Sequence, residues 1–412
     1  MAVAPGLISI LFAIAHPGAA SAAELSGSFT GEAVLYRERP AYPGQRELGR
    51  REQPGLSPAF VYPSLIGEAR LSVPLPLLEA GFTAAPYLRY DHYDKDRSTF
   101  DLREFKLTAL AGDLRLKLGI DTESWGVMEF FNVTDILSQR DNLDGFLGKK
   151  KLGQGMASAE IGTALGTFQA FALTFFRPLD FPGPDGRLRP PLPIEGDDPD
   201  YVSGWGRWQP EGALRYANAF GSVDMTLSHF FGYEREPEMR LEMAGGAPFL
   251  RPRYRLLHQS GLDAVAIVQE WVLRTECALR MGPSGEDPTY AASFGIERTL
   301  PGFSGQGWDL TLIGEYLYDS REQTLVTPFT HSLFGGLRFS LNDTRSSELT
   351  AYYSHDLETE EPSLFITEAS ARLGERIKLV VNGAWIIDPG PGSPFSFLAQ
   401  DSRMSARLSV YF

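Results

Sequence analysis

Cysteine is almost absent from the chain, since Cys277 is the single one among 412 residues. One cysteine excludes a disulfide framework and any zinc or iron–sulfur site built from several thiolates. Lys and Arg number 38 against 52 Asp and Glu, and the net charge of −14 argues against a partner that is nucleic acid. Long hydrophobic runs are missing too, because no segment approaches the about 18 consecutive apolar residues of a membrane-spanning helix.

Familiar catalytic signatures are also missing. The sequence contains no G-x-S-x-G, H-E-x-x-H or C-x-x-C motif. Ser228-His229 and Ser354-His355 are adjacent pairs, but neighbouring residues of a strand point to opposite faces and cannot form a dyad. Other histidines have no assignable partner: His92, His258 and His331. We therefore predict a protein that is not an enzyme and that holds no metal or cofactor.

The N-terminus predicts export. Residues 7–15 form one short apolar run, and the small residues of 19–23 follow it. An apolar core followed by an A-x-A-like site is typical of a secretory signal peptide, although the segment before it lacks Lys and Arg. We predict a cleaved signal peptide over 1–23 and a mature chain over 24–412, with a soluble N-terminal helix as the alternative.

Apolar and polar residues alternate over most of the remaining chain. Between Trp308 and Tyr318 the apolar side chains, such as Leu312, occupy one set of alternate positions, while Thr311 and Glu315 occupy the other. A β-strand has a period of two, so this segment predicts a strand with one apolar and one polar face.

Eighteen segments follow this pattern, and most have the length of a tilted transmembrane strand, about 10 to 13 residues. They are 26–36, 60–74, 82–92, 99–110, 113–122, 154–165, 167–177, 209–220, 222–233, 256–267, 270–281, 288–299, 308–319, 331–341, 346–356, 362–373, 376–387 and 400–412. The fold prediction is a single all-β transmembrane antiparallel β-barrel of about eighteen strands, with sixteen as the alternative.

The connections between these segments alternate in length. Tight turns such as 111–113 and 342–344 stand between long connections. The long ones are 37–59, 123–153, 178–208, 234–255, 320–330 and 388–399. Long outer loops and short periplasmic turns characterise outer-membrane barrels, and an even strand number places the N- and C-termini on the periplasmic side.

The C-terminal segment carries a resemblance. It ends Arg-Leu-Ser-Val-Tyr-Phe, with Phe412 last on an apolar-alternating strand. With the signal peptide and the alternating strands, this resembles Gram-negative outer-membrane β-barrels. Trp308 to Arg321 and Leu333 to Thr344 resemble an uncharacterised porin-like group, and the barrel is similar in size to the alginate exporter. The resemblance implies the outer membrane as location, its lipid and lipopolysaccharide as surroundings, and Phe412 as part of the signal read by the barrel-assembly machinery.

The strand register places many charges in the lumen. A charge on the lipid face near mid-depth costs about 2–4 kcal/mol for Arg or Lys, so inward orientation is strongly favoured. The predicted lumen charges are Arg115, Lys117, Arg274, Glu276, Glu315, Arg338, Arg403 and Arg407. Two alternatives follow: the charges select solutes, or they form cross-strand ion pairs that merely solvate the wall.

Loop 123–153 combines aromatic residues with charges. We expect its aromatics to be buried against the barrel wall, which makes the loop a constriction, with a surface loop as the alternative. Thr134 to Leu143 predicts one short helix within it. The candidate constriction residues are Trp125, Glu129, Asp135, Arg140, Asp141 and Asp144.

Three functions remain open. The favoured one is a channel for passive diffusion of small solutes, or for export of an anionic polymer, narrowed by loop 123–153. The others are a non-conducting scaffold or assembly partner and, less favoured, a hydrolase carried on the barrel wall. A Ser/His/acid cluster assembled in space would support the hydrolase.

Overall fold

The period-two pattern forms strands at all eighteen predicted positions. The structure is a computed structural model that describes residues 23–38, 61–76, 79–143, 150–183, 186–283, 285, 287–303, 305, 307–358, 362–387, 389–390, 393 and 395–412. The barrel strands are β1 (Glu24–Tyr36), β2 (Val61–Leu75), β3 (Ala80–Asp91), β4 (Thr99–Ala111), β5 (Leu114–Asp121), β6 (Gln154–Thr163), β7 (Gly166–Phe175), β9 (Glu211–Phe220), β10 (Val223–Tyr233), β13 (Leu256–Val268), β14 (Trp271–Met281), β15 (Thr289–Phe303), β16 (Trp308–Asp319), β17 (His331–Ser340), β18 (Glu348–Asp356), β19 (Pro362–Leu373), β20 (Ile377–Ile386) and β21 (Arg403–Tyr411).

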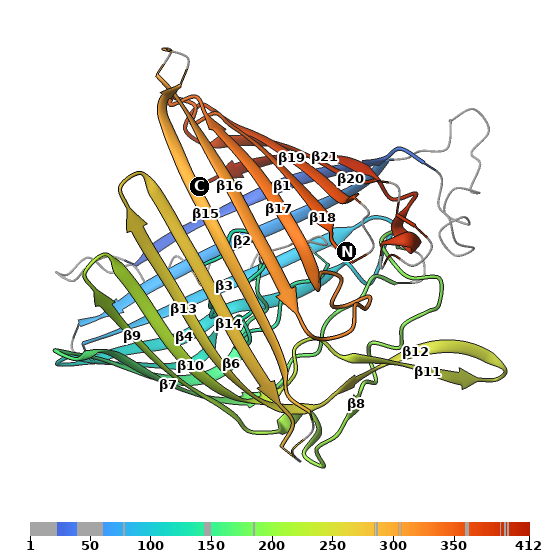
Figure 1. Ribbon diagram of the computed structural model, residues 1–412, viewed down its shortest axis with the longest axis horizontal. Helices are drawn as coiled ribbons and strands as arrows, with labels where there is room; N and C mark the ends of the chain where they lie inside the picture. Colours follow the sequence, from blue (N-terminus) through green and yellow to red (C-terminus); the bar gives the residue numbers. More distant parts are fainter. Residues whose placement is uncertain are drawn as a thin grey trace, which may run out of the picture.

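These strands close into one antiparallel barrel (Figure 1). Each strand pairs with the next one along the chain, and β21 pairs back with β1, from Ser28 opposite Tyr411 to Tyr36 opposite Arg403. Closure leaves no barrel strand with an unpaired edge, which is what a bilayer requires of a spanning sheet. The predicted fold class and the strand number of eighteen are confirmed.

The two ends of the barrel differ. Tight turns join β4 to β5 and β9 to β10 at one end, where β1 also begins and β21 ends. The long connections, including 122–153 and 234–255, are at the other end. The backbone N–H of Phe412 donates to the carbonyl of Gly27 at 3.1 Å, so both described termini of the barrel lie at the short-turn end.

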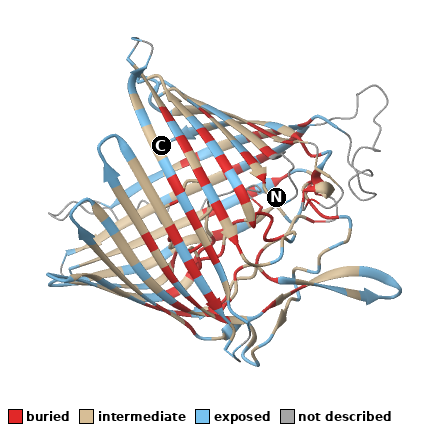
Figure 2. Cartoon of the chain, viewed as in Figure 1, coloured by how far each residue is buried: buried red, intermediate tan, exposed pale blue. Residues whose placement is uncertain are grey.

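The two faces of the wall differ in the way the pattern predicts. On β16, Leu312 is 39% exposed whereas Thr311 is 7% exposed. Figure 2 shows the same alternation of buried and exposed residues along the neighbouring strands. Leucine and aromatic side chains are therefore exposed on the outer face, and Cys277 lies among them.

No helix among the described residues is long and apolar enough to cross a membrane. The described residues contain the 3-10 turns η2 (Gly206–Trp208) and η3 (Ser396–Leu398), and Pro76 after β2 also has 3-10 conformation.

Connection 234–255 differs from its prediction. It contains the hairpin β11 (Glu238–Ala244) and β12 (Ala247–Tyr254), which projects from the long-loop end in Figure 1 and pairs with β8 (Asp200–Tyr201). The signal was present in the sequence, because a Gly-Gly turn at 245–246 separates two alternating segments. The signal-peptide prediction concerns residues of which 1–22 lie outside the described part of the chain.

Candidate functional site

Loop 122–153 leaves β5 and lies against the inner face of the barrel. Its first aromatic residue, Trp125, is 2% exposed and packs edge-on against Phe171 of β7, with ring centroids 5.8 Å apart. Ile136 and Leu137 of the same loop complete this apolar cluster. Burial of these side chains favours an inward loop, since each removes apolar area from water.

Glu276 of β14 anchors the loop. Its carboxylate is fully buried and accepts hydrogen bonds from the backbone N–H groups of Val127, Met128 and Thr134 at 2.5, 3.0 and 3.3 Å. Hydrogen bonds to a charged acceptor are stronger than neutral ones, by roughly a factor of two. The carboxylate of Glu276 thus satisfies three backbone N–H groups of the loop that regular secondary structure would otherwise pair with backbone carbonyl groups.

Glu315 of β16 makes the second anchor. Its carboxylate accepts from the backbone N–H groups of Glu129 at 2.6 Å and Phe130 at 3.0 Å. On the neighbouring strand β17, Phe334 stacks on Phe130 with ring centroids 5.0 Å apart. The predicted lumen charges Glu276 and Glu315 therefore lie at the wall as acceptors for the loop.

The predicted helix from Thr134 to Leu143 is wrong. This segment consists of turns and bends, with an isolated bridge between Arg140 and Lys151. The carbonyl of Val133 accepts from Arg280, and that of Thr134 accepts from Gln259, both at 3.1 Å. The carbonyl groups of Val133 and Thr134, which would accept the first hydrogen bonds of a helix, thus accept from wall side chains instead.

The other candidate residues of the loop are distributed among several partners. Glu129 faces Arg338 at 3.2 Å, and Asp135 pairs with Lys151 at 2.7 Å. The remaining two make the following contacts: Arg140 with Glu236 at 3.8 Å and with the carbonyl of Val326, and Asp141 with Arg103. Asp144 lies outside the described residues.

Most predicted cationic lumen residues have an acidic neighbour. The pairs are Arg115–Glu160 at 2.7 Å, Lys117–Glu123 at 3.0 Å, Arg274–Glu297 at 2.9 Å and Arg407–Glu32 at 2.6 Å. Arg403 differs, because it makes no ion pair or side-chain hydrogen bond with any residue that the structure describes.

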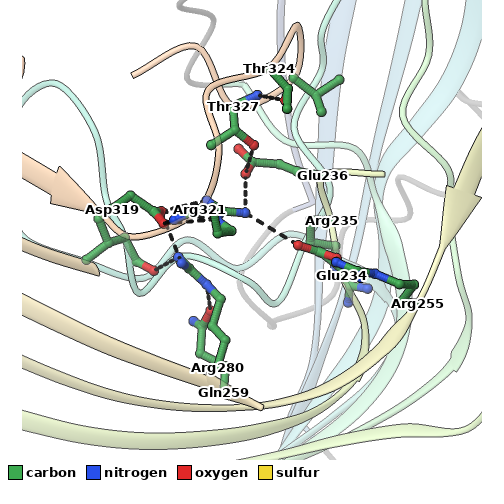
Figure 3. Close-up of polar contacts among 12 residues, drawn as sticks. Glu234, Arg235, Glu236, Arg255, Gln259, Arg280, Asp319, Arg321, Thr324 and Thr327 are labelled. Atoms are coloured by element: carbon green, nitrogen blue, oxygen red, sulfur yellow. Dashed lines mark hydrogen bonds and ion pairs between the residues drawn. The ribbon is translucent and has the colours of Figure 1, made fainter. Parts of the chain in front are cut away.

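A charge cluster that the sequence did not predict lies at the long-loop end (Figure 3). Arg321 contacts Asp319 at 2.7 Å, Glu236 at 2.8 Å and Glu234 at 3.4 Å. Arg280 reaches the same carboxylate of Asp319 at 3.1 Å. The cluster thus joins the 234–237 and 320–330 connections to the wall.

Burial and charge act in opposite directions on the two loop glutamates of this cluster. Burial raises the pKa of Glu234 despite the nearby Arg321. Burial also disfavours the ionised form of Glu236, but Arg321 and Arg140 outweigh it and hold the pKa of Glu236 below its ordinary value. A signal was available, since acidic and basic residues crowd both connections, but the sequence did not show that they meet.

Two cavities lie beside the loop. The larger has a volume of about 490 Å³ and is lined by residues of β17 to β21 and β1, among them Arg338, Arg403 and Arg407. The smaller has a volume of about 260 Å³ and borders the charge cluster around Arg321. Phe130 and Phe131 line both cavities, so the loop separates them.

A polar group also stands on the outer face, between β10 and β13. The Nδ1 atom of His229 lies 3.0 Å from the Ser260 hydroxyl, and its Nε2 atom lies 3.3 Å from Nδ1 of His258. His258 therefore has a partner that the sequence did not reveal. Within the described residues, no group of three His, Cys, Asp or Glu side chains is placed to hold a metal ion.

Comparisons with known proteins give similarity at the level of solved structures alone. No family model matches the chain, and no curated protein matches it. Pseudomonas putida OprB is 11% identical with a TM-score of 0.44, over 99% of this chain and 96% of that one. A mutant Rhodopseudomonas blastica porin is 10% identical with a TM-score of 0.42, over 95% and 99%. A loop-deleted OmpT of Vibrio cholerae, an outer-membrane protein, is 8% identical with a TM-score of 0.43, over 95% and 99%.

At these scores the similarities carry no argument about function. The assignment rests on the strand ladder, which closes, and on the outer face, which is apolar. On that basis the chain has the architecture of bacterial outer-membrane β-barrels.

Proposed function

We propose that the protein is a passive channel in the outer membrane of a Gram-negative bacterium, narrowed by loop 123–153. The observation that carries the proposal is the cavity of about 490 Å³ inside a closed eighteen-stranded barrel, with the loop on one side and a charged wall on the other. A barrel of about 16 to 18 strands is wide enough for an aqueous channel. The loop then reduces the part of that width open to solutes.

The wall supports a selective mechanism. Arg338 and Glu129 face each other across the edge of the larger cavity at 3.2 Å, and Arg403 and Arg407 stand on β21 at the same cavity. Opposite charges placed around a narrow path produce a local field, and pore lining and diameter together set which solutes pass. Small solutes would cross by diffusion, without a coupled energy source.

The two ends support one orientation. We propose that the short-turn end, with both termini, faces the periplasm, and that the long-loop end faces lipopolysaccharide outside the cell. Phe412 supports recognition of the last strand by the barrel-assembly machinery. Its ring stacks on Phe29 with centroids 5.6 Å apart, at the seam where the barrel closes. Phe412→Asp should lower the yield of heat-modifiable, membrane-inserted protein, and an unchanged yield would contradict this role.

The channel is tested by planar-bilayer recording of the refolded full-length protein, with folding checked by heat-modifiable migration. We expect stepwise conductance and, in a salt gradient, a reversal potential that gives the ion preference. Heat-denatured protein in the same detergent is the control. A folded barrel that inserts without conducting would contradict the channel and would support the non-conducting scaffold.

A further inference from the structure

Part of the otherwise charged inner wall of the larger cavity is apolar, where a water-filled pore would be polar. One cross-strand row runs from Tyr352 on β18 through Ile366 and Ala384 to Arg403 on β21, and the register makes each residue the direct partner of the next. Tyr36 on β1 is the partner of Arg403 on its other side. The row is therefore an apolar strip that ends at one guanidinium group.

A second apolar surface lies beside this strip. In the neighbouring row toward the long-loop end, Leu364 of β19 is opposite Ile386 of β20, and both belong to a buried cluster with Phe395 and Leu398. From the inserted loop, Phe130 contacts Tyr352 edge-on with ring centroids 5.0 Å apart. The strip is thus bordered by apolar groups from the wall and from the loop.

Arg403 stands out among the arginines of this cavity. Carboxylates face the others at 2.6 to 3.2 Å: Asp401 at Arg187, Asp91 at Arg97, Glu129 at Arg338 and Glu32 at Arg407. Arg403 has no carboxylate within 4.0 Å among the described residues; the charge of Asp401 acts on it from a greater distance, and Asp401 itself is paired with Arg187. A guanidinium group binds a carboxylate through two parallel hydrogen bonds, so its free donors favour an anionic partner.

The next row toward the short-turn end limits the charge of that partner. It contains Glu368 on β19, which accepts a hydrogen bond from Asn382 at 3.3 Å and has no cationic neighbour within 4.0 Å among the described residues. Glu348 of β18 also lines the cavity. A solute with several negative charges would be repelled by these carboxylates, whereas one carboxylate can remain at Arg403.

We infer that the larger cavity takes an amphipathic monocarboxylate, an inference that rests on the proposed channel function and gives it a substrate class. The carboxylate binds Arg403, and the aromatic or aliphatic body lies along Ala384 and Ile366 toward Tyr352. Adjacent strands are about 4.8 Å apart, so the strip reaches about 10 Å from Arg403 to Ile366. This length fits an arylalkyl acid, and the cavity volume of about 490 Å³ is in the range of small-molecule sites.

The test adds 4-phenylbutyrate to one side of the refolded barrel in planar bilayers. We expect resolvable interruptions of the ionic current, at concentrations about ten-fold below those needed with acetate, which lacks the body, or 4-phenylbutanol, which lacks the charge. Calorimetric titration of the same acid into the detergent-solubilised barrel measures binding independently of conduction.

Three variants separate the contributions. Arg403→Gln should weaken binding by about ten-fold, as expected for one charge-assisted hydrogen-bonding group. Ile366→Ser should weaken it several-fold. Lys378→Gln removes a cation from β20 outside the lining of the cavity, and binding should be unchanged.

The outcomes distinguish the two proposals. A barrel that conducts but shows neither interruption nor binding heat with 4-phenylbutyrate overturns the monocarboxylate site and leaves the channel standing. Equal effects of acetate, or of 4-phenylbutanol, overturn it as well. A barrel that does not conduct, yet binds the acid in an Arg403-dependent way, overturns the channel and supports the site.

Discussion

The two sides of the barrel interior are built differently. On the covered side, formed by β13 to β16, wall groups such as Glu276 and Glu315 have the backbone of loop 122–153 as partner. On the open side, formed by β18 to β21 and β1, the wall faces the larger cavity, and the Arg403 side chain makes no hydrogen bond and no ion pair within 4.0 Å among the described residues. A charged side chain that points into the barrel is therefore not by itself evidence of solute binding, because inward-pointing charged side chains such as Glu276 also hold the loop in place.

The difference has a physical basis in how buried charges are satisfied. A carboxylate removed from water is costly unless several donors replace its hydration. Glu276 is fully buried with three backbone donors, whereas Arg407, paired with Glu32, remains partly exposed at the cavity. We expect changes on the covered side to act through the position of the loop, and changes on the open side to act directly on solutes.

Removal of the loop should give the largest effect. Replacing residues 128–150 by a short Gly-Ser linker leaves the barrel ladder intact, since none of its strand pairs uses this segment. The wall carboxylates would then be hydrated, and the two cavities would merge. Single-channel conductance should rise several-fold and ion preference should weaken. Unchanged conductance from a folded barrel would place the loop outside the permeation path.

Loss of one anchor should have a smaller effect. Glu276→Ala removes the acceptor of three backbone N–H groups, at a cost of about 1–3 kcal/mol in loop docking. We expect noisier single-channel current and faster amide hydrogen exchange in residues 127–134. Glu297→Ala is the matched control, because Glu297 pairs with Arg274 on the wall and not with the loop. Equal exchange rates in both variants would contradict the anchoring role.

The strands were predictable because lipid imposes one pattern on every one of them. The segment predicted at 308–319 is observed as Trp308–Asp319, and that predicted at 362–373 as Pro362–Leu373. Side chains of each strand point alternately to lipid on the outside and to polar or packed groups on the inside, so every strand needs the same alternation of apolar and polar residues. The hairpin of β11 and β12 projects beyond the barrel, where this constraint does not apply, and the sequence predicts only a long connection there.

The site was less predictable because its partners are far apart in the sequence. Val127 and Glu276 are 149 positions apart, and Phe130 and Glu315 are 185 apart. The register predicts that both glutamates point inward, but nothing local shows that a loop amide will reach them. The same limit explains the error over Thr134 to Leu143, where distant wall groups override a local tendency to form a helix.

Arginine substitutions on the two sides should differ in stability. Thr311 of β16 is buried and its hydroxyl lies 2.9 Å from that of Thr299, so Thr311→Arg overfills a packed region at a cost of about 1–3 kcal/mol. Ser405 of β21 lines the larger cavity, where an added guanidinium is hydrated. We expect a clear loss of refolding yield for the first, and for Ser405→Arg only a shift of the reversal potential toward anions. Equal yields would contradict the distinction between a packed and an open wall.

The smallest effect should come from one carboxyl group at the long-loop end of the open side. Asp94 follows β3, lines the larger cavity and is 3% exposed, with Asp91, Asp96 and Arg97 around it. Its Oδ2 atom lies close to Gly186 of the neighbouring connection. Burial raises the pKa of Asp94 from 3.8 to about 6, and the favourable charge of Arg97 does not offset it. The group is therefore ionised at pH 7.5 and mostly protonated at pH 5.

The sign of the pH effect follows from this shift. A carboxyl whose pKa is higher in the folded than in the unfolded state binds its proton more tightly when folded, so its contribution favours the folded state at low pH and is lost as pH rises through about 6. Protonation also removes one negative charge from the cavity, so the preference for anions should increase modestly between pH 7.5 and 5. Reversal potentials across this range measure it. Asp94→Asn should abolish this change of the reversal potential with pH. Asp96→Asn, which removes the same charge two residues away, should retain it. A change that persists in Asp94→Asn would assign the titration to another group.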